Sequence, residues 1–330
     1  MSRVQLSFGL SSNPRTWPLI QGRVVPEGIE PVITVLHPSE LFWRQLKFGD
    51  FDVSEMSLSS WMRLVARGEP DWVGLPIFTT RRFFHTEILI RTDAGIASPG
   101  DLKGKRVGVP EYQQTAALWA RGVLKHEFGV QARDMEFWME RTPEISHSGA
   151  GGFAPPKGVT IHQIPADKSI GSMMAAGELD ATLLYLTNRN LVDRSRVDLA
   201  AHPAVRRLFD PVEEGARYYR KTGIFPINHL TVVRRRLFER HPWLALNILA
   251  AFQEANALLA TERFAAIAYY VETGLIPAAS TDVLAKELVP YGVRANRATL
   301  ETAAVYSYEQ GLTPRQLALA ELFAPATIEL

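Results

Sequence analysis

The chain has 330 residues, which is long for one hydrophobic core, so we expect two lobes. Its formal net charge of +1 argues against a protein that binds nucleic acid through bulk positive charge. The sequence contains no cysteine, which excludes disulfides, thiolate metal sites and a cysteine nucleophile. No apolar run approaches the roughly 20 residues that span a bilayer, so we expect neither nucleic acid nor membrane among its partners.

The amino terminus enters a strand almost at once. Met1-Ser2-Arg3 leads directly into the alternating segment Val4–Phe8, without an apolar signal region or a small-residue cleavage site. We therefore expect a cytoplasmic protein. The loop 9–20 follows this strand and carries Arg15. Open α/β sheets bind ligands at the carboxyl ends of their strands, so Arg15 is a candidate binding residue.

A second strand is predicted at residues 30–36 and a helix at 41–48. A short strand at 52–56 then turns into the next helix through a serine-rich segment. Ser57 and Ser59 stand in this turn, where they can cap the helix or bind a ligand.

Residues 73–93 place Arg81, Arg82 and His85 inside an otherwise apolar stretch. Charged groups near a core are unfavourable unless they face solvent, an acidic partner or an anionic ligand. Arginine forks match planar carboxylates, which favours a binding site. Neighbours on a strand face opposite ways, so we expect only one of the two arginines to point inward. The alternative is one solvated arginine, one structural ion pair and a hydrogen-bonded core histidine.

Residues 101–124 predict a turn, the strand Arg106–Val109 and a polar loop that leads into a helix. Thr115 can cap this helix, which runs from 116 to 128 and ends at Gly129. The unpaired N–H groups at a helix N-terminus attract carboxylates and phosphates. Gln114 and Thr115 are therefore candidate anion-binding residues.

Strands at 135–139, 160–164 and 181–185 alternate with helices, which predicts a mainly parallel, doubly wound lobe. Tyr185 follows the last of these strands, on the expected ligand edge, as do residues 188 and 189. The loop 140–159 is rich in glycine, proline and serine, and we expect its His147 to face solvent, with a lid residue as the alternative.

A strand at 224–233 carries Asn228 and His229 near its start, mirroring Arg82 and His85 on the earlier segment. Two helices separated near His241 follow, and the remainder is predicted to be amphipathic helix that covers the first lobe. The sequence contains no internal repeat, P-loop, dinucleotide fingerprint or two-histidine metal helix.

Several of these segments resemble a known superfamily. The run DLKGKRVGVP (101–110), preceded by SPG and followed by GELDATL (177–183), resembles the type II periplasmic-binding-protein superfamily. Three further segments resemble its branch that contains 4,5-dihydroxyphthalate decarboxylase: PIFTTRRFFH (76–85), VPEYQQTAALWARGVLKHEFGV (109–130) and FPINHLTVVRRRLFERHPWL (225–244).

The resemblance implies an α/β fold of two doubly wound lobes joined by two crossing strands. Residues 1–93 and 230–330 would form the first lobe and residues 94–229 the second, with a ligand cleft between them. It also implies that the turn with Ser57 and Ser59 lines this cleft.

The activity implied by the resemblance is the non-oxidative decarboxylation of a dihydroxylated aromatic dicarboxylate, which would make the chain a carboxy-lyase. Such a substrate needs cations for its carboxylates, a proton donor for the ring carbon and a flat apolar wall. The catalytic candidates are His85, His229 and Glu111. The candidate substrate-binding residues are Arg15, Ser57, Ser59, Arg81, Arg82, Tyr112, Gln114, Thr115, Tyr185 and Asn228.

We expect no cofactor, although a divalent metal held by His85, Glu111 and His229 is an alternative because these are nitrogen and oxygen ligands. A substrate-binding protein for an anionic aromatic acid and a cofactor-biosynthesis enzyme remain as rival functions on the same fold. The sequence also leaves a homo-oligomer open.

Overall fold

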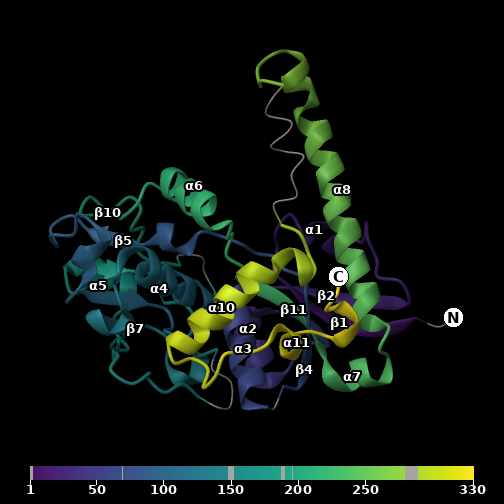
Figure 1. The fold of residues 1–330 in the computed structure, drawn as a ribbon, viewed down its shortest axis with the longest axis horizontal. Helices are drawn as coiled ribbons and strands as arrows, with labels where there is room; N and C mark the ends of the chain where they lie inside the picture. Colours follow the sequence, from purple (N-terminus) through teal and green to yellow (C-terminus); the bar gives the residue numbers. More distant parts are fainter. Residues whose placement is uncertain (1–2, 69, 148–151, 187–189, 195, 279–288) are drawn as a thin grey trace.

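The computed structural model describes residues 3–68, 70–147, 152–186, 190–194, 196–278 and 289–330. Two sheets with helices packed on them form two lobes that lie side by side (Figure 1). The sheet of the first lobe is mixed: β1 pairs in parallel with its two neighbours, whereas β11 is antiparallel to both of its own. In spatial order its strands are β2 (Ile29–Val35), β1 (Val4–Leu10), β3 (Val53–Ser57), β11 (His229–Arg234) and β4 (Trp72–Leu75).

The second sheet has three parallel pairings at its centre and far edge, and two antiparallel pairings at the other edge. Its strands in spatial order are β10 (Val205–Arg207), β5 (Leu89–Arg91), β9 (Ala181–Thr182), β6 (Arg106–Val109), β7 (Glu136–Met139) and β8 (Thr160–Gln163). Because β5 belongs to this sheet, the chain has already crossed before Leu89, several residues earlier than the expected boundary at 93.

One capping prediction for α4 is confirmed and the other was wrong. Thr115 was expected to cap this helix, but it is the first helical residue, and Gln114 is the N-cap, without a side-chain hydrogen bond. The helix α4 ends at Gly129, which adopts the left-handed φ of 66° that glycine tolerates best. The segment before β11, which the sequence left unassigned, forms α6. The principal helices are α2 (Pro38–Phe48), α3 (Leu58–Arg67), α4 (Thr115–Phe128), α5 (Ile170–Ala176), α6 (Pro211–Thr222), α7 (Arg235–Arg240), α8 (Leu244–Glu272) and α10 (Arg297–Glu309).

Two crossing segments join the lobes and pair with each other. Arg81 and Ile227 form an isolated antiparallel bridge, and the Asn228 N–H donates to the Thr80 carbonyl at 2.9 Å. The buried Trp119 of α4 donates its indole N–H to the Ile227 carbonyl at 2.8 Å. The second lobe is thereby tied to the returning segment directly beside Asn228, so this segment is held from both sides.

The helix α10 packs against α3 of the first lobe and α4 of the second, rather than covering the first lobe alone. Its Tyr306 ring lies so close to Gly122 that a Cβ there would come within 2.0 Å of the ring. Only glycine fits at this position, because the two helices could not approach so closely around a larger residue.

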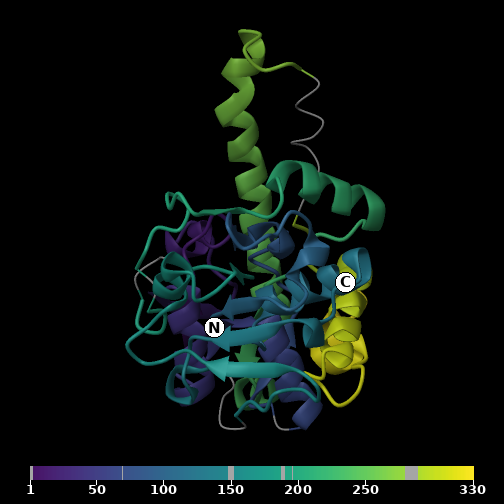
Figure 2. The same cartoon turned by 90° about the vertical axis from the view of Figure 1, so that its left-hand side faces the viewer.

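The helix α8 is different from the others. It packs on the first lobe through its first half, and its second half stands away from the body (Figures 1 and 2). By length and composition it is the one helix in the described ranges that could cross a membrane, and 39% of its most apolar window is buried.

Candidate active site

A cavity of about 560 Å³ lies between the lobes, beside the crossing segments, and we call it the interlobe cavity. The carboxyl ends of β1, β2 and β3, the N-terminus of α4 and both crossing segments contribute to its wall. Its volume is typical of a small-molecule site. It is lined by Ser11, Ser12, Asn13, Val35, Leu36, His37, Pro38, Ser39, Phe42, Ser57, Thr80, Arg82, Phe84, Gln114, Ala116, His147, Leu184, Leu186, Asn228 and His229.

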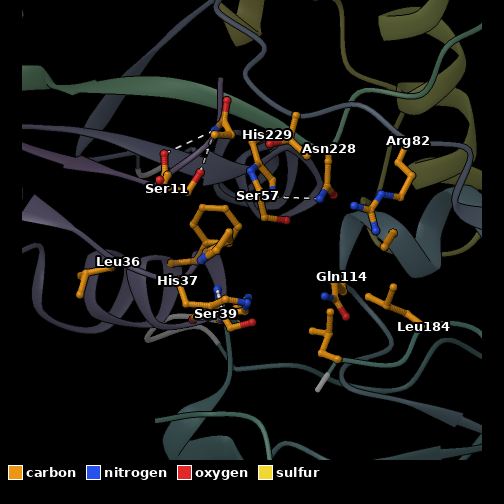
Figure 3. A pocket seen from close by; sticks show the side chains of 18 of the residues that line it. Ser11, Leu36, His37, Ser39, Ser57, Arg82, Gln114, Leu184, Asn228 and His229 are labelled. Atoms are coloured by element: carbon orange, nitrogen blue, oxygen red, sulfur yellow. Dashed lines mark hydrogen bonds between the residues drawn. The ribbon is translucent and has the colours of Figure 1, made fainter. Parts of the chain in front are cut away.

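Five of the residues predicted from the sequence line this cavity: Ser57, Arg82, Gln114, Asn228 and His229. Figure 3 shows Arg82 and Gln114 on one side, His37 and Ser11 on the other, and His229 between them.

Arg82 supplies the cation of the cavity. Its side chain is exposed, and no side chain or carbonyl of the described residues is seen to bind its guanidinium. Arg81 faces the opposite way and donates to the carbonyl of Pro290 at 3.0 Å and to the side chain of Asn296. Only one of the two neighbours faces the cavity, as strand alternation predicts, and the structure shows that it is Arg82.

His229 forms a buried pair with a carboxylate that the sequence analysis did not single out. The His229 Nδ1 lies 3.2 Å from Glu55 Oε2, and the Asn228 side-chain amide lies 2.9 Å from His229 Nε2. Because an amide N–H donates, Nε2 accepts from Asn228 and the proton of the neutral ring is on Nδ1, facing Glu55. This row of three side chains fixes the orientation of the imidazole at the cavity wall.

Glu55 is fully buried, and its carboxylate is well supplied with donors. The N–H and the hydroxyl of Ser11 each donate at 2.7 Å, and the Thr79 hydroxyl donates at 2.5 Å. Burial by itself would raise the pKa of Glu55, but these hydrogen bonds and the contact with His229 hold that pKa below its ordinary value. Glu55 is therefore an ionised partner for His229.

His37 caps the N-terminus of α2 and borders the same cavity. Its Nδ1 accepts the Ser39 N–H at 3.3 Å, so the neutral ring carries its proton on Nε2. Burial lowers the pKa of His37, which favours this neutral form.

His147 was expected in solvent, and that prediction was wrong. Its ring is 3% exposed, its Nε2 donates to the Ser39 carbonyl at 2.7 Å, and the Arg141 guanidinium lies beside it. Burial lowers the pKa of His147 well below its usual value. Glycine and proline correctly indicated a loop, but they carry no information on what the loop packs against, which is α2 of the other lobe.

Glu111 lies behind this wall and does not line the cavity. Its Oε1 accepts the His147 N–H at 2.7 Å, and burial raises its pKa. Arg141 binds Asp193 at 2.7 Å and the Ser39 hydroxyl at 2.8 Å. The contacts of Glu111 and Arg141 form a buried network that joins the second lobe to α2 and holds His147 in place.

The structure does not bring the other predicted residues to the interlobe cavity. His85 is buried against Glu214 at 3.0 Å, and the Arg15 Nε donates to the Thr79 carbonyl.

Thr115 and Ser59 join α4 to α3: the Thr115 hydroxyl accepts from the Ser59 N–H at 2.9 Å. The Tyr112 ring lies 3.6 Å below the Arg121 guanidinium, the Tyr185 hydroxyl donates to Val197, and residues 188 and 189 lie outside the described ranges.

The three residues considered as metal ligands have separate partners: Glu214 for His85, the His147 N–H for Glu111, and Glu55 for His229. In the described part of the chain, no group of three or more such side chains is arranged to hold a metal ion.

Comparisons with known proteins decide the family. No family model matches the chain. A curated 4,5-dihydroxyphthalate decarboxylase of Comamonas testosteroni is 34% identical over 333 residues, which cover 100% of this chain and 99% of that protein. The chain belongs to the 4,5-dihydroxyphthalate decarboxylase family. It is therefore an enzyme of the carboxy-lyase class. A second such protein, of Pseudomonas putida, is 37% identical over 183 residues, covering 56% of this chain and 71% of that protein.

Solved structures agree on the fold. The alkanesulfonate-binding protein SsuA of Xanthomonas axonopodis pv. citri, bound to MOPS, matches with a TM-score of 0.57 at 17% identity, over 99% of this chain and 98% of that one. The desulfurization enzyme DSZB matches with a TM-score of 0.53 at 16% identity, over 99% and 98%. At these identities the likeness shows the fold alone, which is the periplasmic-binding-protein type expected from the sequence.

Proposed function

We propose that this enzyme removes one carboxylate, as carbon dioxide, from a dihydroxylated aromatic dicarboxylate such as 4,5-dihydroxyphthalate. The observation that carries the proposal is the arrangement of the interlobe cavity. It has a cationic arginine at one side, a carboxylate-bound histidine in the middle and a second histidine opposite (Figure 3). The names of the two relatives support the substrate class.

Arg82 and the start of α4 bind the two carboxylates in this proposal. The guanidinium of Arg82 matches one carboxylate with two parallel hydrogen bonds. The other carboxylate lies at the N-terminus of α4, where Gln114 stands and where no side chain in the described part of the chain caps the helix. Free N–H groups and the helix dipole favour an anion there.

His229 is the proposed proton donor. The imidazole takes up a proton on Nε2, in place of the hydrogen bond that this atom accepts from Asn228, while Nδ1–H stays on the ionised Glu55, which stabilises the imidazolium. The Nε2 proton then passes to the ring carbon that carries the leaving carboxylate. The carbon–carboxylate bond then breaks, its electron pair restores the aromatic ring, and carbon dioxide leaves. Solvent returns the proton to His229, so the balance is one proton taken up for each carbon dioxide released.

His37 is the proposed partner of the ring hydroxyl para to the reacting carbon. An ionised hydroxyl there supplies the electron density that allows the carbon to accept a proton. Because His37 Nδ1 accepts from Ser39, the proton is on Nε2, and this N–H donates to the phenolate oxygen in the proposal. The side of the cavity opposite Arg82 suits a substrate whose hydroxyls and carboxylates are at opposite ends of the ring (Figure 3). Arginine, imidazole and helix N–H groups supply every step, so we propose catalysis without a metal or organic cofactor.

The test is carbon dioxide release by the purified enzyme from 4,5-dihydroxyphthalate, with and without a chelator. Wild type should release carbon dioxide equally in both conditions. Arg82→Ala should lower kcat/KM by roughly 100-fold or more, because a carboxylate loses its charged partner. The exposed Arg236→Ala is the matched control and should not change the rate.

Release that requires a metal would contradict the cofactor proposal and leave the substrate proposal standing. Saturable binding of the diacid without release would contradict the proposed substrate. An unchanged rate in Arg82→Ala would contradict the carboxylate clamp.

A further inference from the structure

A second cavity, of about 480 Å³, lies where α4 of the second lobe meets the end of α10, and we call it the basic pocket. Its wall is formed by α4, the loop before it, residues 131–133 and 156–159, and residues 308–311 at the end of α10. It shares no described lining residue with the interlobe cavity. Its volume is within the range of small-molecule sites.

Arg121 of α4 is the buried cation of the basic pocket. It is only 1% exposed, and its Nε donates to Gln310 Oε1 at 2.9 Å. Gln310 in turn donates to the Leu118 carbonyl at 2.9 Å, so the amide that orients the guanidinium is itself fixed. Among the described residues, neither Nη1 nor Nη2 of Arg121 has a hydrogen-bond partner. The guanidinium is therefore held in one orientation by Nε, with both terminal nitrogens unpaired.

The charge of Arg121 has no carboxylate partner in the described part of the chain. Burial lowers the pKa of Arg121 to about 10, so the side chain still carries its charge at neutral pH. The Tyr112 ring centroid lies 3.6 Å from the guanidinium carbon, and this cation–π contact stabilises the charge but accepts none of its N–H donors. A buried charge is normally paired with an opposite charge, so an anion is the ligand expected here.

Tyr112 supplies a third buried donor to the same pocket. It is 0% exposed, and its hydroxyl has no hydrogen-bond partner among the residues that the structure describes. Its ring is fixed by an edge contact with Phe137 at 5.1 Å and by stacking with Phe153 at 5.8 Å. The pocket thus brings together three buried donors, two from Arg121 and one from Tyr112, that lack acceptors.

Further cations stand at the rim of the basic pocket. Arg133 and Lys157 are exposed, and neither forms an ion pair with a carboxylate in the described ranges. Lys125 and Glu309, which also line the pocket, pair with each other at 2.9 Å. Because the whole chain has a net charge of only +1, this positive charge is a local concentration. It attracts the same kind of ligand that the buried donors require.

We propose that the basic pocket binds a phosphate group, either as inorganic phosphate or as part of a small phosphomonoester. A carboxylate has two oxygens, whereas a phosphate group offers three terminal oxygens to the two Arg121 nitrogens and the Tyr112 hydroxyl. Its negative charge lies between Arg121 inside the pocket and Arg133 and Lys157 at the rim. A volume of about 480 Å³ also accommodates a small organic group attached to the phosphate.

The experiment is isothermal titration calorimetry of the whole protein with inorganic phosphate and with glycerol 3-phosphate at low salt. Wild type should bind at least one of them with a Kd below about 1 mM, and the tighter of the two identifies the source of the phosphate group. Arg121→Met keeps the length of the side chain but removes its charge and donors, and should raise the Kd at least about 30-fold. Arg82→Ala removes the cation of the interlobe cavity and should leave this Kd unchanged.

Two milder variants test the pocket without removing a buried charge. Tyr112→Phe deletes a hydroxyl that has no partner in the described chain, so it should not destabilise the fold, yet it should raise the Kd about 10-fold. Arg133→Ala combined with Lys157→Ala removes the rim cations and should raise the Kd roughly fivefold. The matched control removes two exposed cations of α7, Arg236→Ala with Arg240→Ala, and should keep the wild-type Kd.

Four results would overturn the proposal. The first is no saturable binding of either probe by wild type below about 10 mM. The second is a wild-type Kd in Arg121→Met, or in both Tyr112→Phe and the rim variant. Loss of binding in Arg82→Ala would place the anion in the interlobe cavity instead. Malonate bound by Arg82→Ala as tightly as phosphate would replace the phosphate group with a dicarboxylate.

Discussion

The His229–Glu55 pair and the His85–Glu214 pair are both buried, and they differ mainly in what surrounds the histidine. His229 lies 3.2 Å from Glu55 and faces the interlobe cavity, whereas His85 lies 3.0 Å from Glu214 among the rings of Phe83, Phe209 and Tyr218. Both pairs have the same chemical groups. The comparison shows that only the His229 pair borders the interlobe cavity, and this is why we propose His229 rather than His85 as the proton donor.

The partners of the two carboxylates differ as well. Glu214 also binds Arg217 at 2.7 Å, so its charge is satisfied without the histidine. Glu55 has hydroxyl and N–H donors but, in the described ranges, no arginine or lysine ion pair. Its remaining partner among the described residues is the His229 ring, at 3.2 Å.

The largest expected effect is the difference in kcat between variants of His229 and of His85. His229→Gln should lower kcat by roughly 1,000-fold, because a general acid contributes about 100- to 10,000-fold. His85→Gln should keep kcat within about threefold. Carbon dioxide release by both variants, with circular dichroism to check folding, measures this difference; equal losses in the two would break the comparison.

The carboxylates should differ in the same direction by a smaller factor. We expect Glu55→Gln to lower kcat roughly 10- to 100-fold, because the amide still orients the ring but no longer stabilises the imidazolium. Glu214→Gln should leave kcat unchanged within about threefold. A wild-type kcat in Glu55→Gln would show that the Glu55–His229 pair has a structural role and no role in catalysis.

The His85–Glu214 pair should matter for the free energy of unfolding, although it should not matter for the rate. His85→Leu removes a buried hydrogen bond but leaves Glu214 paired with Arg217, so we expect a loss of about 1–3 kcal/mol in the free energy of unfolding at pH 7. Urea unfolding measures this loss. No change in the urea midpoint would mean that the hydrogen bond contributes nothing net.

The smallest effect is on the pH dependence of stability. Burial lowers the pKa of His85 more than Glu214 raises it, so the folded chain keeps this ring neutral. Below about pH 6.5 the unfolded chain takes up a proton that the folded chain does not, and stability falls as the pH falls. The slope should be up to about 1.4 kcal/mol per pH unit steeper in wild type than in His85→Leu. Parallel profiles from urea titrations at pH 5 to 7 would contradict this assignment.

Local sequence signals predicted most of the framework. Alternating apolar residues located β1 and β2, and Gly129 located the end of α4. The alternation of strand neighbours correctly implied that only one of Arg81 and Arg82 points inward. These features depend on residues within a few positions of each other, which is why the sequence carries them.

Contacts between distant segments decided the site. Residue 55 is one polar position in a short strand, and nothing local marks Glu55 as the partner of a histidine 174 residues later. His147 lies in a glycine-rich loop, yet α2 of the other lobe buries it. His85 and His229 occupy similar places on the two crossing segments, but α6 covers one and the cavity borders the other. The sequence by itself determined the lobes, the crossings and the residue types available for catalysis. Which histidine borders the cavity depends on how elements distant in the chain pack together, and only the tertiary structure decides that.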